Sequence, residues 1–223
     1  MRKDNRNRPL LGLFRLLTAL SLLVYLGAMV LIWNLTIAES RNTLNHISAM
    51  LVQGVRTTLN SHELVLRGLG EELIAMGALK APERGRALIE RMKNIDPGMI
   101  GFGLARADGQ LVLVSSIPRG EALPNLATRA ETRDGYLEVL QAGRLRTGRP
   151  YFFEQLGGWV VAIRVPLYDA DNRLQAVMTA GYNIEGGTTA WANMQLPPDV
   201  SVALAGEDRY PRYVHPLRRF TQS

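Results

Sequence analysis

Three patterns of apolar and polar residues follow one another along the chain. Residues 16–38 form an uncharged and largely apolar run. Leucines and other apolar residues then recur every three or four positions as far as Met76. From Met99 onward, short apolar and β-branched runs alternate with turns rich in Gly, Pro, Asp and Asn. These patterns predict an apolar helix, an amphipathic helix and a β-sheet, in that order.

The uncharged run at 16–38 is long enough to cross a membrane, because a hydrocarbon core of about 30 Å needs roughly 20 helical residues. A cleaved signal peptide usually has a shorter apolar region and an A-x-A site. No such site follows here, so an uncleaved signal anchor is favoured. A buried core helix is seldom so uniformly apolar. We therefore predict a cytoplasmic segment at 1–15 and a transmembrane helix at 16–38.

The charge supports an orientation for this anchor. Basic residues outnumber acidic ones before the apolar run, where Asp4 is the only acidic residue against Arg2, Lys3, Arg6, Arg8 and Arg15. Positive charge favours the cytoplasmic side, which places the chain after about Glu39 across the membrane. We expect a single-pass protein of the bacterial inner membrane, with most of the chain in the periplasm.

Residues 39–80 are predicted to form a long periplasmic helix. One face is apolar and the other carries polar and charged side chains. The apolar face comprises Leu44, Ile47, Leu51, Val55, Leu59, His62, Leu66, Leu69, Leu73 and Met76. Such a helix serves as a stalk, pairs with a second subunit or packs on the following domain, and the spacing does not decide among these.

The second half of the chain predicts an antiparallel α+β domain. A short helix at 82–93 precedes two strands at 99–105 and 111–115, which are joined by a turn containing Gly109. A helix at 132–142 with a stop at Gly143 is inserted before three more strands, and these are predicted to form a β-meander. The predicted later strands are 151–155, 159–167 and 174–182.

The last part of the chain predicts the start of a second module. Gly186 and Gly187 suggest a hinge, and 188–194 suggests a short helix. A hairpin follows, made of a strand at 200–205 and a second strand that ends at Val214. These residues are too few to bury a core of their own.

Composition narrows the function classes. The chain has 223 residues, a net charge of +6 and no cysteine. This length allows one domain and a modest remainder, and the missing cysteines exclude disulfides, thiol catalysis and thiolate zinc sites. The basic residues cluster at the N-terminus, which is a weak argument for a nucleic-acid partner, so none is expected.

Motifs for catalysis are missing from the sequence. His46, His62 and His215 are scattered, and there is no metalloprotease, nucleophile-elbow or phosphate-loop pattern. The stretch from Asp169 to Asn172 is similar to the opening of a calcium loop, but Arg173 follows where an oxygen ligand is expected, so a plain turn is favoured. We therefore expect no enzyme activity, no metal and no cofactor within this chain.

One set of residues suggests a ligand pocket instead. Arginines and aromatic residues from the inserted helix, the loop after it and three neighbouring strands would converge above one face of the sheet. Arginine binds carboxylate in bidentate fashion, and aromatic walls suit a small organic ligand. The alternative is that the aromatic residues are core and the arginines are solvated. The predicted site comprises Arg133, Tyr136, Arg149, Tyr151, Trp159 and Tyr182.

The chain resembles the extracytoplasmic sensor domains of the Cache superfamily, which have the PAS-like PDC fold. The resemblance is carried by ARADGQLVLVSS at 105–116, by RDGYLEVLQAG at 133–143 and by the segment from TGRPYFF to YNIEG at 147–186. The segment MQLPPDVSVALAGEDRYPRYVHP at 194–216 is similar to the beginning of the second lobe of double-Cache sensors. The N-terminal halves of membrane diguanylate cyclases and sensor histidine kinases are particularly similar.

The resemblance implies a small-molecule sensor that dimerises through its long helix and signals through the membrane helix. It implies a sensor core at 81–187 and a hinge with a shortened second lobe at 188–223. Amino-acid-binding members usually carry an arginine and a tryptophan near the inserted helix. Here Arg133 and Tyr136 lie in that region without a tryptophan, so an amino-acid ligand is not supported.

The sequence leads to two further expectations. Because no output domain precedes Ser223, the sequence is a fragment, a truncated reading frame or a shortened relative. An anchored docking module for another envelope protein is the alternative function, in which the pocket is simply filled core.

Overall fold

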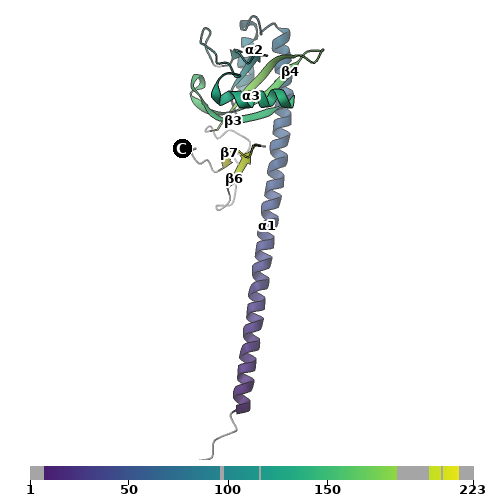
Figure 1. Cartoon of the computed structure of the whole chain (residues 1–223), viewed down its shortest axis with the longest axis vertical. Coiled ribbons are helices and arrows are strands. Elements are labelled where there is room, and N and C mark those ends of the chain that lie inside the picture. The colour runs from purple at the N-terminus through teal and green to yellow at the C-terminus, as the bar shows by residue number, and fades with distance from the viewer. Residues whose placement is uncertain (1–7, 96–97, 116, 185–200, 207, 216–223) are drawn as a thin grey trace, which may run out of the picture. The chain divides into compact units, whose positions relative to one another are not determined.

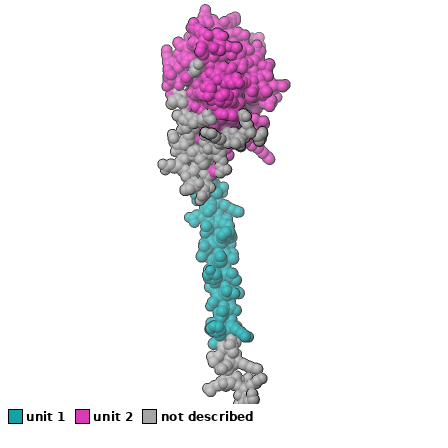
Figure 2. All heavy atoms as spheres, turned by 90° about the vertical axis from the view of Figure 1, so that its left-hand side faces the viewer, with its two compact units in different colours: residues 1–58 teal, residues 59–223 magenta. Residues whose placement is uncertain are grey.

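The computed structural model describes residues 8–95, 98–115, 117–184, 201–206 and 208–215. Helix α1 (Arg8–Ala75) is continuous, so the predicted membrane and periplasmic helices form one helix that ends before Gly77 and not at residue 80. Gly77 has a φ of 76°, a conformation that suits glycine and stops the helix. Figure 1 shows α1 as one unbroken helix. Packing divides the chain into two units, residues 1–58 and residues 59–223 (Figure 2).

The first unit contains the apolar part of α1. Among the described residues, one helix is long and apolar enough to cross a membrane, by length and composition. Its large apolar side chains, such as Leu23, Ile32 and Trp33, are exposed. An apolar helix surface of this kind needs a lipid or protein environment to remove it from water.

The second unit is built on a five-stranded antiparallel sheet. Its strands are β1 (Met99–Arg106), β2 (Leu111–Val114), β3 (Arg146–Phe153), β4 (Gly158–Tyr168) and β5 (Leu174–Asn183). Their order is β2-β1-β5-β4-β3, which contains the predicted meander of the last three strands. The first hairpin is joined to this meander because β1 pairs with β5.

Helices cover both faces of this sheet. Leu66, Leu69 and Leu73 of α1 and Ile89 of α2 (Glu83–Ile95) form one core with alternate residues of β4 and β5. On the opposite face, α3 (Ala130–Ala142) forms a second core and contacts β3 and β4. Gly143 ends α3 in the left-handed conformation, as predicted. Burial on both faces explains why β4 is an almost continuous apolar run.

A second, two-stranded sheet is formed by β6 (Val202–Ala205) and β7 (Pro211–His215). It corresponds to the predicted C-terminal hairpin, and β7 contacts β3 of the larger sheet. The predicted hinge at Gly186 and Gly187 and the helix at 188–194 lie outside the described residues. The α+β class and the five-stranded antiparallel sheet are confirmed.

Candidate ligand-binding site

A pocket of about 800 Å³ lies between α3, β3, β4 and the turn that joins β6 to β7. Both charged and aromatic side chains reach it. The residues that line it include Arg129, Glu131, Asp134, Glu138, Arg149, Tyr151, Trp159, Arg164, Asp208, Tyr210 and Arg212. This volume lies within the range of small-molecule sites in proteins, which are roughly 300–1,000 Å³.

An irregularity in β3 shapes one wall of the pocket. The pairing of β3 with β4 shifts register between Thr147 and Pro150. Strand β3 is an edge strand, where a proline and a bulge are both tolerated. A bulge redirects side chains, and Arg149 within it extends to the turn after β6, where its Nε lies 3.0 Å from Asp208 Oδ2.

Two glycines make room for a charged side chain at the base of the pocket. A Cβ atom on Gly148 would lie 2.8 Å from Nη1 of Arg164, and one on Gly135 would lie 3.0 Å from the same atom. Both distances are shorter than ordinary contacts between carbon and nitrogen. Glycine on α3 and on β3 therefore allows the Arg164 guanidinium of β4 to occupy the space between them.

Arg164 is the most unusual residue of the pocket. It is 1% exposed, and its Nε has no hydrogen-bond partner. Within the described part of the chain, no carboxylate forms an ion pair with it. Burial lowers the pKa of its guanidinium below the ordinary value, and the hydroxyl groups of Tyr151 and Tyr136 oppose this shift. A buried cation without an anion is costly, so this arrangement suits an anionic ligand.

The turn between β6 and β7 adds a second charged cluster. The Asp208 carboxylate is shared by two guanidinium groups, because Arg212 Nη2 lies 3.2 Å from Oδ1 while Arg149 binds Oδ2. The guanidinium carbon of Arg149 lies 4.8 Å from the centre of the Tyr210 ring. These contacts hold the turn against β3 through charge and cation–π attraction.

Acidic residues on α3 line another part of the pocket. Arg129 Nε is paired with Glu131 at 3.0 Å. Asp134 and Glu138 also line the pocket and lie one helical turn apart. The pocket therefore combines a buried guanidinium with carboxylates from α3, a combination that suits ligands with both an acidic and a basic group.

The structure brings three of the six predicted site residues to the pocket, namely Arg149, Tyr151 and Trp159. Tyr151 is nearly buried beside Phe153, with the two rings 6.1 Å apart. Trp159 packs edge-to-face against Phe152. Their role in binding remains a prediction.

The other three predicted residues do not line the pocket. Arg133 is exposed on α3. Tyr136 is buried in the core under α3 and donates its hydroxyl to the carbonyl of Ala107 at 2.8 Å. Tyr182 lies on the opposite face of the sheet, where its hydroxyl is 2.8 Å from Nδ1 of His62 on α1. The predicted convergence of all six on one face assumed side-chain directions that a sequence does not specify.

Sequence reasoning missed Arg164, Arg212 and the acidic residues of α3. A signal for Arg164 is present, because it is the one charged residue in the apolar run GWVVAIRVPL at 158–167. A charge inside a strand that is buried on both faces must be compensated, and such a residue is a candidate for binding.

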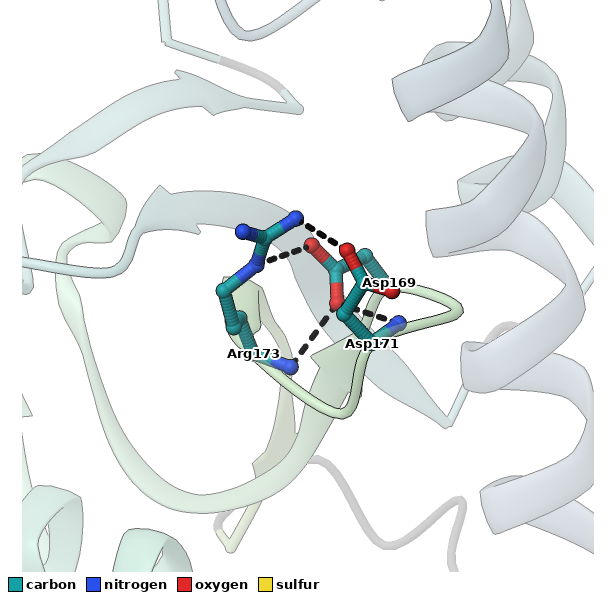
Figure 3. A network of polar contacts seen from close by, with 3 residues as sticks. All are labelled: Asp169, Asp171 and Arg173. Atoms are coloured by element: carbon teal, nitrogen blue, oxygen red, sulfur yellow. Dashed lines mark hydrogen bonds and ion pairs between the residues drawn. The ribbon is translucent and has the colours of Figure 1, made fainter.

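The calcium-like stretch has the arrangement of a turn (Figure 3). The Asp169 carboxylate accepts hydrogen bonds from the backbone N–H groups of Asp171 and Arg173, and the Arg173 side chain binds both carboxylates. Asn172 has a φ of 60°, which asparagine tolerates. The carboxylates of Asp169 and Asp171 are therefore already paired with a cation, the guanidinium of Arg173.

The sequence matches no protein-family model and no curated protein. Several solved structures share the fold. The ligand-binding domain of the Pseudomonas fluorescens chemoreceptor CtaA, in complex with L-serine, matches 77% of this chain and 70% of its own, with a TM-score of 0.55 and 15% identity. The ligand-binding domain of the Campylobacter jejuni chemoreceptor Tlp3, in complex with L-valine, matches 73% of this chain and 64% of its own, with a TM-score of 0.51 and 15% identity.

These similarities establish the fold of the chain. It has the fold of chemoreceptor ligand-binding domains, as the resemblance to Cache sensors predicted. The solved neighbours that share this fold are ligand-binding domains.

Proposed function

We propose that this chain is the extracytoplasmic input module of a membrane signalling protein, and that its pocket binds a small solute bearing a carboxylate. The observation that carries the proposal is Arg164, a fully buried guanidinium whose Nε has no partner and which lines a pocket of about 800 Å³. A ligand carboxylate would supply the missing anion and accept hydrogen bonds from the guanidinium.

The structural neighbours support a ligand of this class. CtaA and Tlp3 were solved with the amino acids L-serine and L-valine. If the ligand is an amino acid, its carboxylate pairs with Arg164 and its ammonium faces the carboxylates of Asp134 and Glu138. An amino-acid ligand therefore does not require a tryptophan beside Arg133 and Tyr136, because neither of these two residues lines the pocket.

Transmission would use α1, which is common to both units. The basic residues before Leu16 favour a cytoplasmic N-terminus, and the apolar part of α1 would cross the inner membrane. In a homodimer paired through α1, ligand would favour one of two arrangements of this helix. The difference in ligand affinity between the two arrangements would set the size of the signal.

The test is ligand-induced stabilisation of the full chain in lipid nanodiscs. Amino acids and simple carboxylic acids are added one at a time, and the thermal midpoint is measured. A ligand at a hundred times its Kd stabilises the folded state by about 2.7 kcal/mol, which raises the midpoint by several degrees. We expect Arg164→Met to remove this shift and Arg144→Met, at an exposed position outside the pocket, to keep it.

Two results would contradict the proposal. The first is an equal shift in Arg164→Met and the native chain. The second is the absence of any shift across the panel together with stable capture of an envelope protein, which would favour the docking module.

A further inference from the structure

We infer that Arg212 is a second anion-binding residue of the pocket, so that the preferred solute carries two acidic groups, one for each of two buried arginines. The inference rests on the proposed function, because it specifies the chemical class of the ligand at the same site. It also implies that the solute links the five-stranded sheet to the β6–β7 hairpin.

The state of the Arg212 side chain is the first observation. Its side chain is 8% exposed, and it lines the same pocket as Arg164. Nη2 contacts Asp208, but Nε and Nη1 are buried without a hydrogen-bond partner. Arginine presents its N–H groups in a fixed planar fork that matches a carboxylate. Nε and Nη1 lie on different edges of the planar guanidinium, so donors on two edges are left without an acceptor among the described residues.

The charge balance of the hairpin is the second observation. Asp208 is a single carboxylate, and it is shared by Arg149 and Arg212. This group of three residues therefore keeps one positive charge in excess. Arg149 is half exposed and stacks on Tyr210, so solvent and the ring compensate it. Arg212 is buried, and a second anion beside it would compensate the excess charge.

The two arginines come from different parts of the fold. Arg164 belongs to β4 of the large sheet, whereas Arg212 belongs to β7 of the small one. A solute with one acidic group needs only Arg164. A solute with two acidic groups would contact both sheets, and binding would reduce the motion of the hairpin relative to β3.

The experiment compares ligands that differ in one charge. The full chain in nanodiscs is titrated calorimetrically with succinate against succinamate, and with L-glutamate against L-glutamine. Each pair differs by one carboxylate replaced with an amide of nearly the same shape. We expect the diacid to bind at least about tenfold more tightly than the amide in at least one pair.

Variants assign this preference to one residue. Arg212→Gln should reduce the ratio between diacid and amide to about one while leaving the affinity for the amide nearly unchanged. Arg212→Lys should keep part of the preference, since it keeps the charge. Arg164→Met should abolish binding of all four probes, and Arg144→Gln should change nothing. Hydrogen exchange supplies an independent readout, because the diacid should protect β6–β7 and the amide should not.

The outcomes separate this inference from the proposed function. Equal affinities for diacid and amide in the native chain, with binding still lost in Arg164→Met, would overturn the role of Arg212 and retain the carboxylate sensor. A preference that survives in Arg212→Gln would also overturn it. Absence of binding by all four probes at millimolar concentration, and by the wider panel above, would overturn both.

Discussion

At the scale of single residues, the pocket is defined by one charged side chain in an apolar strand. Strand β4 is buried along nearly its whole length, and Arg164 is its one charged residue, at a position that faces α3. Removing a guanidinium from water costs several kcal/mol unless an anion compensates it. The glycines at 135 and 148 preserve the space for this side chain, which indicates that the surrounding backbone is built to hold it.

The first prediction at this scale concerns Gly148→Ala. The new methyl group would lie 2.8 Å from Nη1 of Arg164, the far end of a flexible side chain, so the guanidinium must move while the strand keeps its fold. We expect ligand affinity to fall about tenfold, which corresponds to roughly 1.4 kcal/mol, in a calorimetric titration. The thermal midpoint without ligand should change by only a few degrees.

The matched control is Gly68→Ala on α1, where a methyl group would meet no atom within 4 Å. This variant should bind as the native chain does, and alanine should stabilise the helix slightly. Unchanged ligand affinity in Gly148→Ala would mean that the position of Arg164 does not matter for binding.

The sequence shows which residue types suit ligand binding, but it does not show in which direction their side chains point. Arg149, Tyr151 and Trp159 are predicted site residues because of their residue type, and they line the pocket. Tyr136 and Tyr182 are predicted for the same reason, but Tyr136 lies in the core under α3 and Tyr182 lies in the core under α1. A strand places successive side chains on opposite faces, so a shift by one residue at the bulge in β3 changes which ones meet.

At the scale of elements, the sequence predicts which helices and strands are present better than it predicts where each begins and ends. All five strands of the large sheet were expected, and four of them begin within a residue of the expected position. Strand β3 begins at Arg146 and not at Tyr151. Its first residues, Arg-Thr-Gly-Arg, lack an apolar pattern, and of these only Arg146 and Thr147 pair with β4 before the register shift. Edge strands of this kind carry little signal in composition.

The prediction for the β6–β7 hairpin concerns Asp208→Asn. Because the carboxylate joins Arg149 and Arg212, its loss should free the hairpin from β3. We expect faster hydrogen exchange at the backbone amides of residues 202–206 and 212–214, with the five-stranded sheet unchanged. Asp171→Asn is the control, since it removes an aspartate that is paired with an arginine in the exposed turn before β5, away from the hairpin. Equal exchange of the hairpin in both variants would contradict the role of Asp208.

The same contact should weaken in acid. Burial raises the pKa of Asp208, but the N–H of Tyr210 and the charges of Arg149 and Arg212 outweigh this, so the pKa lies below its ordinary value. A carboxylate with a lowered pKa stabilises the folded contact above its ordinary pKa and loses this effect as the pH falls through the lowered one. In the native chain the protection of the hairpin amides, measured relative to their intrinsic exchange rate at each pH, should therefore fall in strongly acidic solution, and Asp208→Asn should lack this dependence.

At the scale of the whole molecule, local patterns predict the class of the fold, and long-range pairing completes it. The helices, the turns and the meander of β3, β4 and β5 follow from neighbouring residues. The pairing of β1 with β5 joins residues at least 70 positions apart and has no local signature. The pocket depends on this arrangement, and on the hairpin of the second sheet, so its composition could not be derived from local patterns.

The most direct test of the account is the nitrogen resonance of the Arg164 side chain. Nitrogen NMR of the full chain in detergent micelles resolves arginine Nε–H groups, and loss of one signal in Arg164→Met assigns it. In the native chain without ligand, a buried Nε–H should be protected from exchange. We predict that this resonance shifts and saturates as succinate or an amino acid is added. A resonance that does not move with any carboxylate of the panel would contradict the central claim that this pocket binds an anionic solute.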